Sequence, residues 1–175
     1  MHPHRGKEEM VFKRIFGFMI LTLVVPLLSA TSGPSFWLRD VGGQEHNVNE
    51  YIGQGKWAVV AVWSADCPIC RREIYHMTFF HEEHAKTDAL VLGVSVDGFA
   101  NRDKIRRFIE DQGLNFSNLV AEPDDVRRFG GGRLIGTPTY YFFSPDGRLM
   151  KTHQGAVTQQ QAEDFIHALA KTGST

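Results

Sequence analysis

Residues 57–70 have the sequence WAVVAVWSADCPIC, and this stretch decides the fold. Its first seven residues are apolar and partly β-branched, which predicts a buried strand, and Arg71 to Ala85 predicts a following helix. The chain's only two cysteines, Cys67 and Cys70, stand at the junction with C-x-x-C spacing. We expect Cys67 at the positive end of the helix, where a thiolate is favoured, and Cys70 one turn later, within disulfide reach. This layout is typical of a dithiol redox site.

The cysteine pair has two other readings. In an exported chain, two cysteines can form a purely structural disulfide. A bridge that closes so short a loop removes little entropy from the unfolded chain, so the spacing favours a redox switch. Four-ligand zinc sites usually need a second Cys/His pair. His76, His81 and His84 lie on the predicted following helix, where we expect a solvated face, and we predict no metal site.

The motifs around this stretch resemble those of the thioredoxin superfamily, and within it the exported TlpA/ResA/DsbE-like thiol-disulfide oxidoreductases. That group carries F-x-L-x-D-x-x-G, then G-K ahead of a strand, and then W-x-x-x-C-x-x-C-x-x-E. The matching segments here are Phe36 to Gly43, Gly55-Lys56, and Trp63 to Glu73. The resemblance covers residues 36–169. It implies a thioredoxin-like α/β fold and a redox-active Cys67–Cys70 disulfide without any further cofactor.

The remaining pattern predicts one α/β domain over residues 36–172. Residues 36–48 predict an N-terminal β-hairpin that turns at Gly42-Gly43. The strand at 57–63, a helix over 67–86 and a strand at 90–96 form a β-α-β unit, whose strands should be parallel.

The second half of the chain continues the pattern. An amphipathic helix over 101–112, an extended stretch at 114–120 and a short helix at 124–129 resemble the central strand-helix insert of TlpA-like proteins. A hairpin over 139–154 and a helix over 158–170 complete the domain.

Cys67 is the expected attacking thiolate, and Cys70 is expected to resolve the mixed disulfide. Pro68 fits the first helical turn, where its missing N–H is not needed. Pro68 and Ile69 stand between the cysteines and are candidate substrate contacts and tuners of the redox potential. Asp66 departs from the family pattern, and its carboxylate should raise the pKa of Cys67 unless Arg71 or Arg72 offsets it. Alternatively, Asp66 caps the helix.

Glu73 falls one helical turn after Cys70, so its side chain can lie near the dithiol. It matches the acidic residue of TlpA/ResA-like proteins, and we expect it to accept the proton of Cys70 during resolution. Thioredoxin instead has an aspartate where this chain has Ala61. An ordinary surface glutamate is the alternative. The family's proline two residues after this glutamate is replaced by Tyr75, which leaves the helix kink open.

Thr137-Pro138 stands directly before the strand expected at 139–144 and matches the cis-proline site of the superfamily. A cis X-Pro bond there would present backbone groups of Thr137 to an extended substrate peptide. A trans proline that opens an edge strand is the alternative. Trp63 is expected to pack beneath the active-site loop and to contribute to the substrate site.

The first thirty residues predict a signal peptide or an uncleaved signal anchor. Four basic residues precede an apolar run over residues 15–28, which a Ser-Ala pair follows. If uncleaved, this run would tether the chain to the inner membrane. The expected location is therefore periplasmic or otherwise extracytoplasmic. The formal charge of −1 supplies no basic field, so we expect no nucleic-acid partner.

We therefore expect an exported thiol-disulfide oxidoreductase, more specifically a reductase. Its partners would be protein thiols and disulfides and an upstream membrane thiol donor, and the resemblance implies substrates such as apocytochrome c or copper-chaperone thiols. A peroxiredoxin-like peroxidase is an alternative, because residues 64–67 give S-x-x-C, although Val60 stands where that signature needs proline. A copper-binding chaperone would use Cys67, Cys70 and a distant histidine such as His153. A redox-inert interaction module is the remaining alternative.

Overall fold

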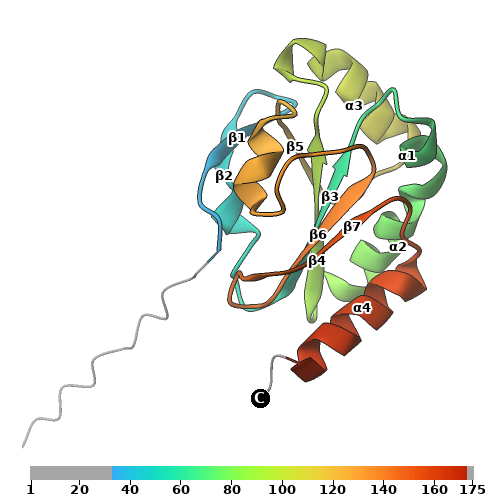
Figure 1. Cartoon of the computed structure of the whole chain (residues 1–175). Coiled ribbons are helices and arrows are strands. Elements are labelled where there is room, and N and C mark those ends of the chain that lie inside the picture. Colours follow the sequence, from blue (N-terminus) through green and yellow to red (C-terminus); the bar gives the residue numbers. More distant parts are fainter. Residues whose placement is uncertain (1–32, 173–175) are drawn as a thin grey trace, which may run out of the picture.

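The computed structural model describes residues 33–172, which form one central sheet with helices packed against it (Figure 1). The strands are β1 (Trp37–Asp40), β2 (Glu45–Asn47), β3 (Trp57–Trp63), β4 (Ala89–Ser95), β5 (Ser117–Val120), β6 (Thr139–Phe143) and β7 (Leu149–Gln154). The α-helices are α1 (Pro68–Glu73), α2 (Tyr75–His84), α3 (Arg102–Asp111) and α4 (Gln159–Thr172). Short 3-10 helices are η1 (Val48–Glu50), η2 (Phe99–Asn101) and η3 (Asp125–Phe129).

The strands form one sheet in the order β2-β1-β5-β4-β3-β6-β7. β3 pairs in parallel with β4, and β4 with β5, while the other pairings are antiparallel. The predicted parallel β-α-β unit is therefore confirmed. Because parallel strands end at the same edge, the segments after β3, β4 and β5 meet there, and in open α/β sheets this edge carries functional sites.

β3 is buried on both sides, which explains its unbroken apolar sequence. Its odd-numbered residues, 59, 61 and 63, lie in a core cluster with side chains from α1, α2, α3 and α4. Its even-numbered residues lie in a second cluster on the other face, together with side chains from β1, η1 and η3. The sheet is thus covered by α-helices on one face and by shorter elements on the other.

The predicted N-terminal hairpin is confirmed, since β1 and β2 pair antiparallel across the turn that contains Gly43. The helix predicted over residues 67–86, whose kink the sequence left open, is divided, because α1 and α2 are separated at Ile74. The N–H of Met77 bonds to the carbonyl of Ile74 at 2.9 Å, three residues back, so a tighter turn interrupts the helix. The kink therefore forms without a proline at position 75. The short helix near residue 124 is the 3-10 helix η3.

The leader predicted at residues 1–30, including the apolar run at 15–28, lies outside the described residues. Within residues 33–172, none of the helices is long and apolar enough to cross a membrane.

Candidate active site

The turn between β3 and α1 places the cysteine pair at the carboxyl edge of the sheet. The N–H of Cys67 bonds to the carbonyl of Ser64 at 3.1 Å, which closes the turn. Cys67 is itself the N-cap of α1, and its Sγ accepts the N–H of Cys70 at 3.1 Å. The alternative that Asp66 caps the helix is therefore wrong. Pro68 occupies the first helical turn, as predicted.

The two thiols have different environments, although both are free cysteines. Burial alone would raise the pKa of Cys67, but hydrogen bonds from the side chains of Cys70 and Thr137 and from the N–H groups of Cys70 and Ile69 outweigh it and lower the pKa. Cys70 is fully buried, and this burial, together with its hydrogen bond to Cys67, raises its pKa to about 12. Cys67 is therefore the thiol that ionises first, and Cys70 stays protonated beneath it.

The Thr137-Pro138 peptide bond is cis, as predicted. It brings the carbonyl oxygen of Thr137 to 3.3 Å from Sγ of Cys67, whose thiol donates to it. The hydroxyl of Thr139 donates to the carbonyl of Gly136 at 2.7 Å, which holds the Thr137-Pro138 loop against the start of β6. Backbone groups of a loop distant in sequence thus lie next to the expected nucleophile.

Of the other predicted substrate contacts, Pro68 and Ile69 are exposed beside Cys67, whereas Trp63 is not. Trp63 is fully buried, stacks on Phe108 at 4.4 Å between ring centroids, and donates its indole N–H to Asn118 at 3.2 Å. A direct contact between Trp63 and a substrate is incompatible with this burial. Its expected position beneath the active-site loop agrees with the structure.

Asp66 is exposed and pairs with α3. Its carboxylate accepts a 2.6 Å hydrogen bond from Lys104 of α3, and neither Arg71 nor Arg72 forms an ion pair with it among the described residues. Arg71 instead lies over the ring of Phe108. The predicted net rise in the pKa of Cys67 is wrong, because the hydrogen bonds from residues 69, 70 and 137 lower this pKa.

Sequence reasoning missed Asp97, which holds the segment before Cys67. Its carboxylate accepts the Ser64 hydroxyl at 2.7 Å, the Ala65 N–H at 2.8 Å and the Ser95 hydroxyl at 2.9 Å. Its side chain is only 6% exposed, and Lys104 lies 3.6 Å away. The available signal was the position of Asp97 at the end of β4, at the same sheet edge as the end of β3.

Glu73 ends α1 and pairs with Arg72 and His76, each at 3.9 Å. No hydrogen bond joins Glu73 to either cysteine within residues 33–172. The buried phenol of Tyr140 interacts electrostatically with both thiols and with Glu73. Burial raises the pKa of Tyr140, and the charges of Cys70, Cys67 and Glu73 raise it further. The charge of Glu73 therefore acts on a residue that also interacts with both thiols. The role of Glu73 in proton transfer stays a prediction.

The histidines after the cysteines do not form the fully solvated face that we expected. His81 is half-buried and accepts the N–H of Val91 at 3.0 Å, and His84 contacts Asp88 at 3.0 Å and Glu163 at 3.4 Å. Within the described part of the chain, Glu83, His84 and Glu163 form the one group of three potential metal ligands. This group includes neither cysteine, and His153 packs against Phe165 instead.

Comparisons with known proteins agree with this arrangement. The thiol-disulfide oxidoreductase ResA of Halalkalibacterium halodurans is 27% identical over 137 residues, which cover 77% of this chain and 73% of ResA. A thioredoxin family thiol:disulfide interchange protein of Chlorobium tepidum superposes with a TM-score of 0.68 at 22% identity, covering 80% of this chain and 96% of that protein. A secreted Mycobacterium tuberculosis disulfide oxidoreductase homologous to E. coli DsbE gives 0.62 at 20% identity, over 76% and 95% of the two chains.

These matches confirm the predicted thioredoxin-like fold and the resemblance to ResA and DsbE. The family model described as the AhpC/TSA family matches residues 30–152. That range runs from before β1 into β7 and contains Cys67, Cys70 and the Thr137-Pro138 loop. Because the match spans well over half of the 175 residues, the chain belongs to the AhpC/TSA family.

Proposed function

We propose that this protein is an exported thiol-disulfide oxidoreductase that reduces disulfides of envelope proteins. The observation that carries the thiol-disulfide exchange chemistry is the asymmetry of the thiols, because a partly exposed Cys67 with a lowered pKa stands over a buried Cys70 with a pKa of about 12. Such a pair has one attacking and one resolving thiol. The relatives named thiol-disulfide oxidoreductase support the same chemistry.

In the first step, the Cys67 thiolate attacks one sulfur of a substrate disulfide. A bond forms between Cys67 and that sulfur, the substrate S–S bond breaks, and the other substrate sulfur leaves as a thiolate. The N–H of Cys70, 3.1 Å from Sγ of Cys67, stabilises the attacking anion in the free enzyme.

In the second step, Cys70 loses its proton and attacks Sγ of Cys67. The mixed disulfide breaks, the second substrate sulfur leaves as a thiolate, and two electrons have passed from the dithiol to the substrate. Because the pKa of Cys70 is about 12, its ionisation needs a proton acceptor. Glu73, one turn later on α1, is our candidate.

The surface around Cys67 suits an extended peptide. Pro68 and Ile69, which follow Cys67, are exposed, and the Thr137 carbonyl lies 3.3 Å from the sulfur of Cys67. We assign these residues to substrate binding, since backbone groups next to a nucleophile can pair with an extended chain.

Repeated turnover requires an upstream thiol donor in the membrane. If the apolar run at 15–28 tethers the chain to the membrane, it keeps the domain near this donor. The name of the secreted Mycobacterium tuberculosis homologue supports an extracytoplasmic location. The direction of electron flow depends on the potential of the pair. A lowered pKa of Cys67 stabilises the reduced form and moves the potential towards that of an oxidant.

The deciding experiment equilibrates the protein in defined thiol/disulfide buffers, quenches with acid, and counts free thiols by alkylation and mass. A midpoint at or below about −220 mV supports a reductase, and one near about −120 mV contradicts that direction and indicates an oxidant. Failure to form the Cys67–Cys70 disulfide contradicts both. A Cys70→Ser variant that consumes peroxide as fast as the intact protein would indicate the peroxidase alternative instead.

A further inference from the structure

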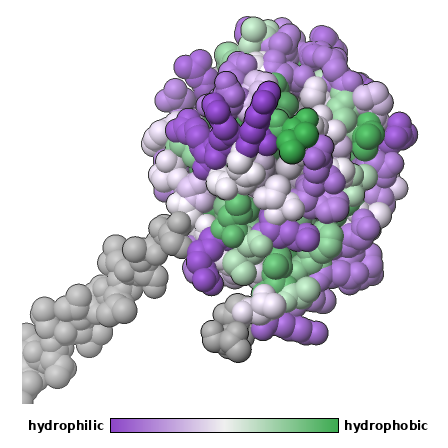
Figure 2. All heavy atoms as spheres, viewed as in Figure 1, coloured by the Kyte–Doolittle hydropathy of each residue, from purple (hydrophilic) through white to green (hydrophobic). Residues whose placement is uncertain are grey.

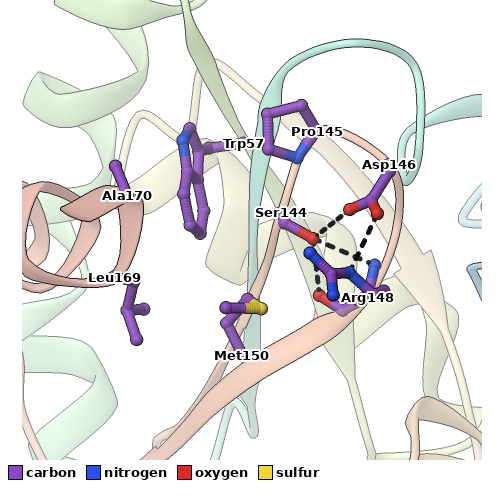
Figure 3. A pocket seen from close by; sticks show the side chains of 8 residues that line it. All are labelled: Trp57, Ser144, Pro145, Asp146, Arg148, Met150, Leu169 and Ala170. Carbon is purple, nitrogen blue, oxygen red and sulfur yellow. Dashed lines mark hydrogen bonds and ion pairs between the residues drawn. The ribbon is translucent and has the colours of Figure 1, made fainter. Parts of the chain in front are cut away.

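A cavity of about 290 Å³ opens at the edge of the sheet opposite the thiols. Trp57, Met150 and Leu169 give it an apolar lining, and Ser144, Asp146 and Arg148 form a polar side (Figure 3). Arg148 pairs with Asp146 at 2.9 Å along that side. Figure 2 shows hydrophobic side chains gathered low on the visible face, beside the C-terminal end of α4.

The cavity is remote from the proposed redox chemistry. Trp57 is the first residue of β3, whereas Cys67 lies in the turn after Trp63, the last residue of β3. A seven-residue strand is about 20 Å long, so the cavity and the thiols lie at opposite edges of the sheet.

The chain enters the folded domain next to this cavity. Gly33 packs so closely against the turn between β6 and β7 that a Cβ on it would lie 3.0 Å from the carbonyl oxygen of Gly147. The same turn receives a hydrogen bond from Gly55 to Pro145. Gly33 therefore packs on the turn that borders the cavity.

The apolar run at 15–28 ends five residues before Gly33. Five residues span at most about 18 Å when fully extended. If the run lies in a bilayer, Gly33 and the β6–β7 turn that it packs against cannot stand farther than this from the membrane.

The charges around this edge suit a membrane with anionic lipids. Lys56 and Lys171 are the sequence neighbours of the lining residues Trp57 and Ala170, and Lys86 follows Ala85, whose carbonyl accepts a 2.6 Å hydrogen bond from Lys56. The acidic residue among them is Asp88, whose carbonyl accepts the N–H of Trp57, while Arg148 and Asp146 pair with each other. As a whole, the chain from residue 31 onward is mildly acidic, with 15 basic and 18 acidic residues. Basic side chains near an anionic bilayer are attracted to it, and a half-buried tryptophan is typical of the lipid-water interface.

We propose that this edge of the domain, the surface around the Trp57 cavity, rests on the membrane that the leader enters, so that Cys67 faces away from the bilayer. The proposal rests on the proposed role of the leader as a membrane anchor and is independent of the thiol chemistry. It implies that an upstream donor must present its thiols about 20 Å above the membrane surface.

The test reconstitutes the full chain into vesicles of phosphatidylcholine with a minority of phosphatidylglycerol, whose acyl chains carry bromine as a tryptophan quencher. We expect quenching that Trp57→Phe largely removes. Trp37→Phe is the matched control, because Trp37 is 59% exposed but lies beside Phe99 and Val120, near the thiol edge. Equal quenching in wild type and Trp57→Phe, or no association with vesicles, overturns the proposal.

A second measurement needs no variant. Amine-reactive labelling with and without vesicles should show several-fold slower modification of Lys86 and Lys171, and an unchanged rate at Lys104 near the thiols. Uniform protection of all three overturns the proposal. Protection of Lys86 and Lys171 without vesicles that grows with protein concentration also overturns it, because a second copy of the chain would then cover this edge.

Discussion

The ammonium group of Lys104 lies 2.6 Å from the carboxylate of Asp66 and 3.6 Å from that of Asp97. Lys104 comes from α3, whereas Asp66 directly precedes Cys67. The hydrogen bond to Asp66 and the charge of Asp97 raise the pKa of Lys104, so this side chain stays charged. The negative charge beside the expected nucleophile is therefore balanced from a different helix.

Replacing Lys104 with glutamine should raise the pKa of Cys67, because the charge of Asp66 would then oppose its ionisation. The expected rise is roughly 0.5 at low salt, the size for charges separated by a few ångströms of solvated surface. It should shrink at high salt, since the pair is largely exposed. The measurement is the pH dependence of the rate of Cys67 alkylation.

Asp66→Asn separates this effect from a structural one. In that background, Lys104→Gln should raise the pKa of Cys67 by less, since Asp97 is then the one carboxylate near Lys104 that loses a counter-charge. An equal rise in both backgrounds would mean that Lys104 acts on Cys67 by another route.

Asp97→Asn should destabilise the protein by about 1–3 kcal/mol, because the amide cannot accept all three hydrogen bonds from residues 64, 65 and 95. Asp103→Asn is the matched control, since Asp103 is exposed and pairs only with Arg106 among the described residues. Urea unfolding of the three proteins at neutral pH gives the comparison.

The stability that Asp97→Asn removes should decrease as the pH falls. Burial raises the pKa of Asp97, but hydrogen bonds from residues 65, 64 and 95 and the charge of Lys104 outweigh it and hold the pKa below its usual 3.8. The folded state thus binds fewer protons, so this contribution is complete above about pH 4 and disappears as the pH falls through the folded pKa. The stability difference between wild type and Asp97→Asn should therefore narrow in acid. A difference that widens there would contradict the assignment.

The sequence predicted those parts of the site that depend on local order. The limits of β3 agree with the prediction because every residue from 57 to 63 is apolar, and a strand buried on both faces requires this. The cysteine turn and the cis bond before Pro138 likewise follow from short motifs.

The parts that were missed depend on contacts between distant segments. Asp97 bonds to Ser64 across 33 positions and Lys104 to Asp66 across 38, so no spacing within one element reveals them. The break at Ile74 was left open because the only known signal, a proline, was absent. A single 3-10 turn does not change the spacing of the apolar residues enough for the helical periodicity to reveal it.

Gly93→Ala should destabilise the protein by about 1–3 kcal/mol. A Cβ at position 93 of β4 would collide with the side-chain oxygen of Asn118 and lie 3.0 Å from the ring of Phe116. Asn118 would have to move and give up the indole hydrogen bond of Trp63. The loss should be smaller in an Asn118→Ala background, measured by urea unfolding, and an equal loss there would place the strain elsewhere.

Cys70→Ser should accumulate a mixed disulfide with a protein disulfide substrate, because the first step proceeds and the resolving thiol is missing. Cys67→Ser should form none, since the remaining thiol is buried with a pKa of about 12. Non-reducing electrophoresis after acid quenching distinguishes the two variants. Adducts of equal yield on both would contradict the assignment of Cys67 as the nucleophile.

Native alkylation should modify one cysteine only. The half-exposed Cys67 should react with a pH midpoint below 9.0, the ordinary value for a thiol, while Cys70 should stay unmodified up to the pH at which the fold is lost. Substituting Cys70 with alanine removes a side-chain hydrogen bond that lowers the pKa of Cys67, so the midpoint should move upward. Peptide mass mapping identifies the modified residue. A midpoint that stays unchanged in Cys70→Ala would show that Thr137 and the backbone N–H groups of residues 69 and 70 stabilise the thiolate without the buried thiol, which would then contribute only to resolution.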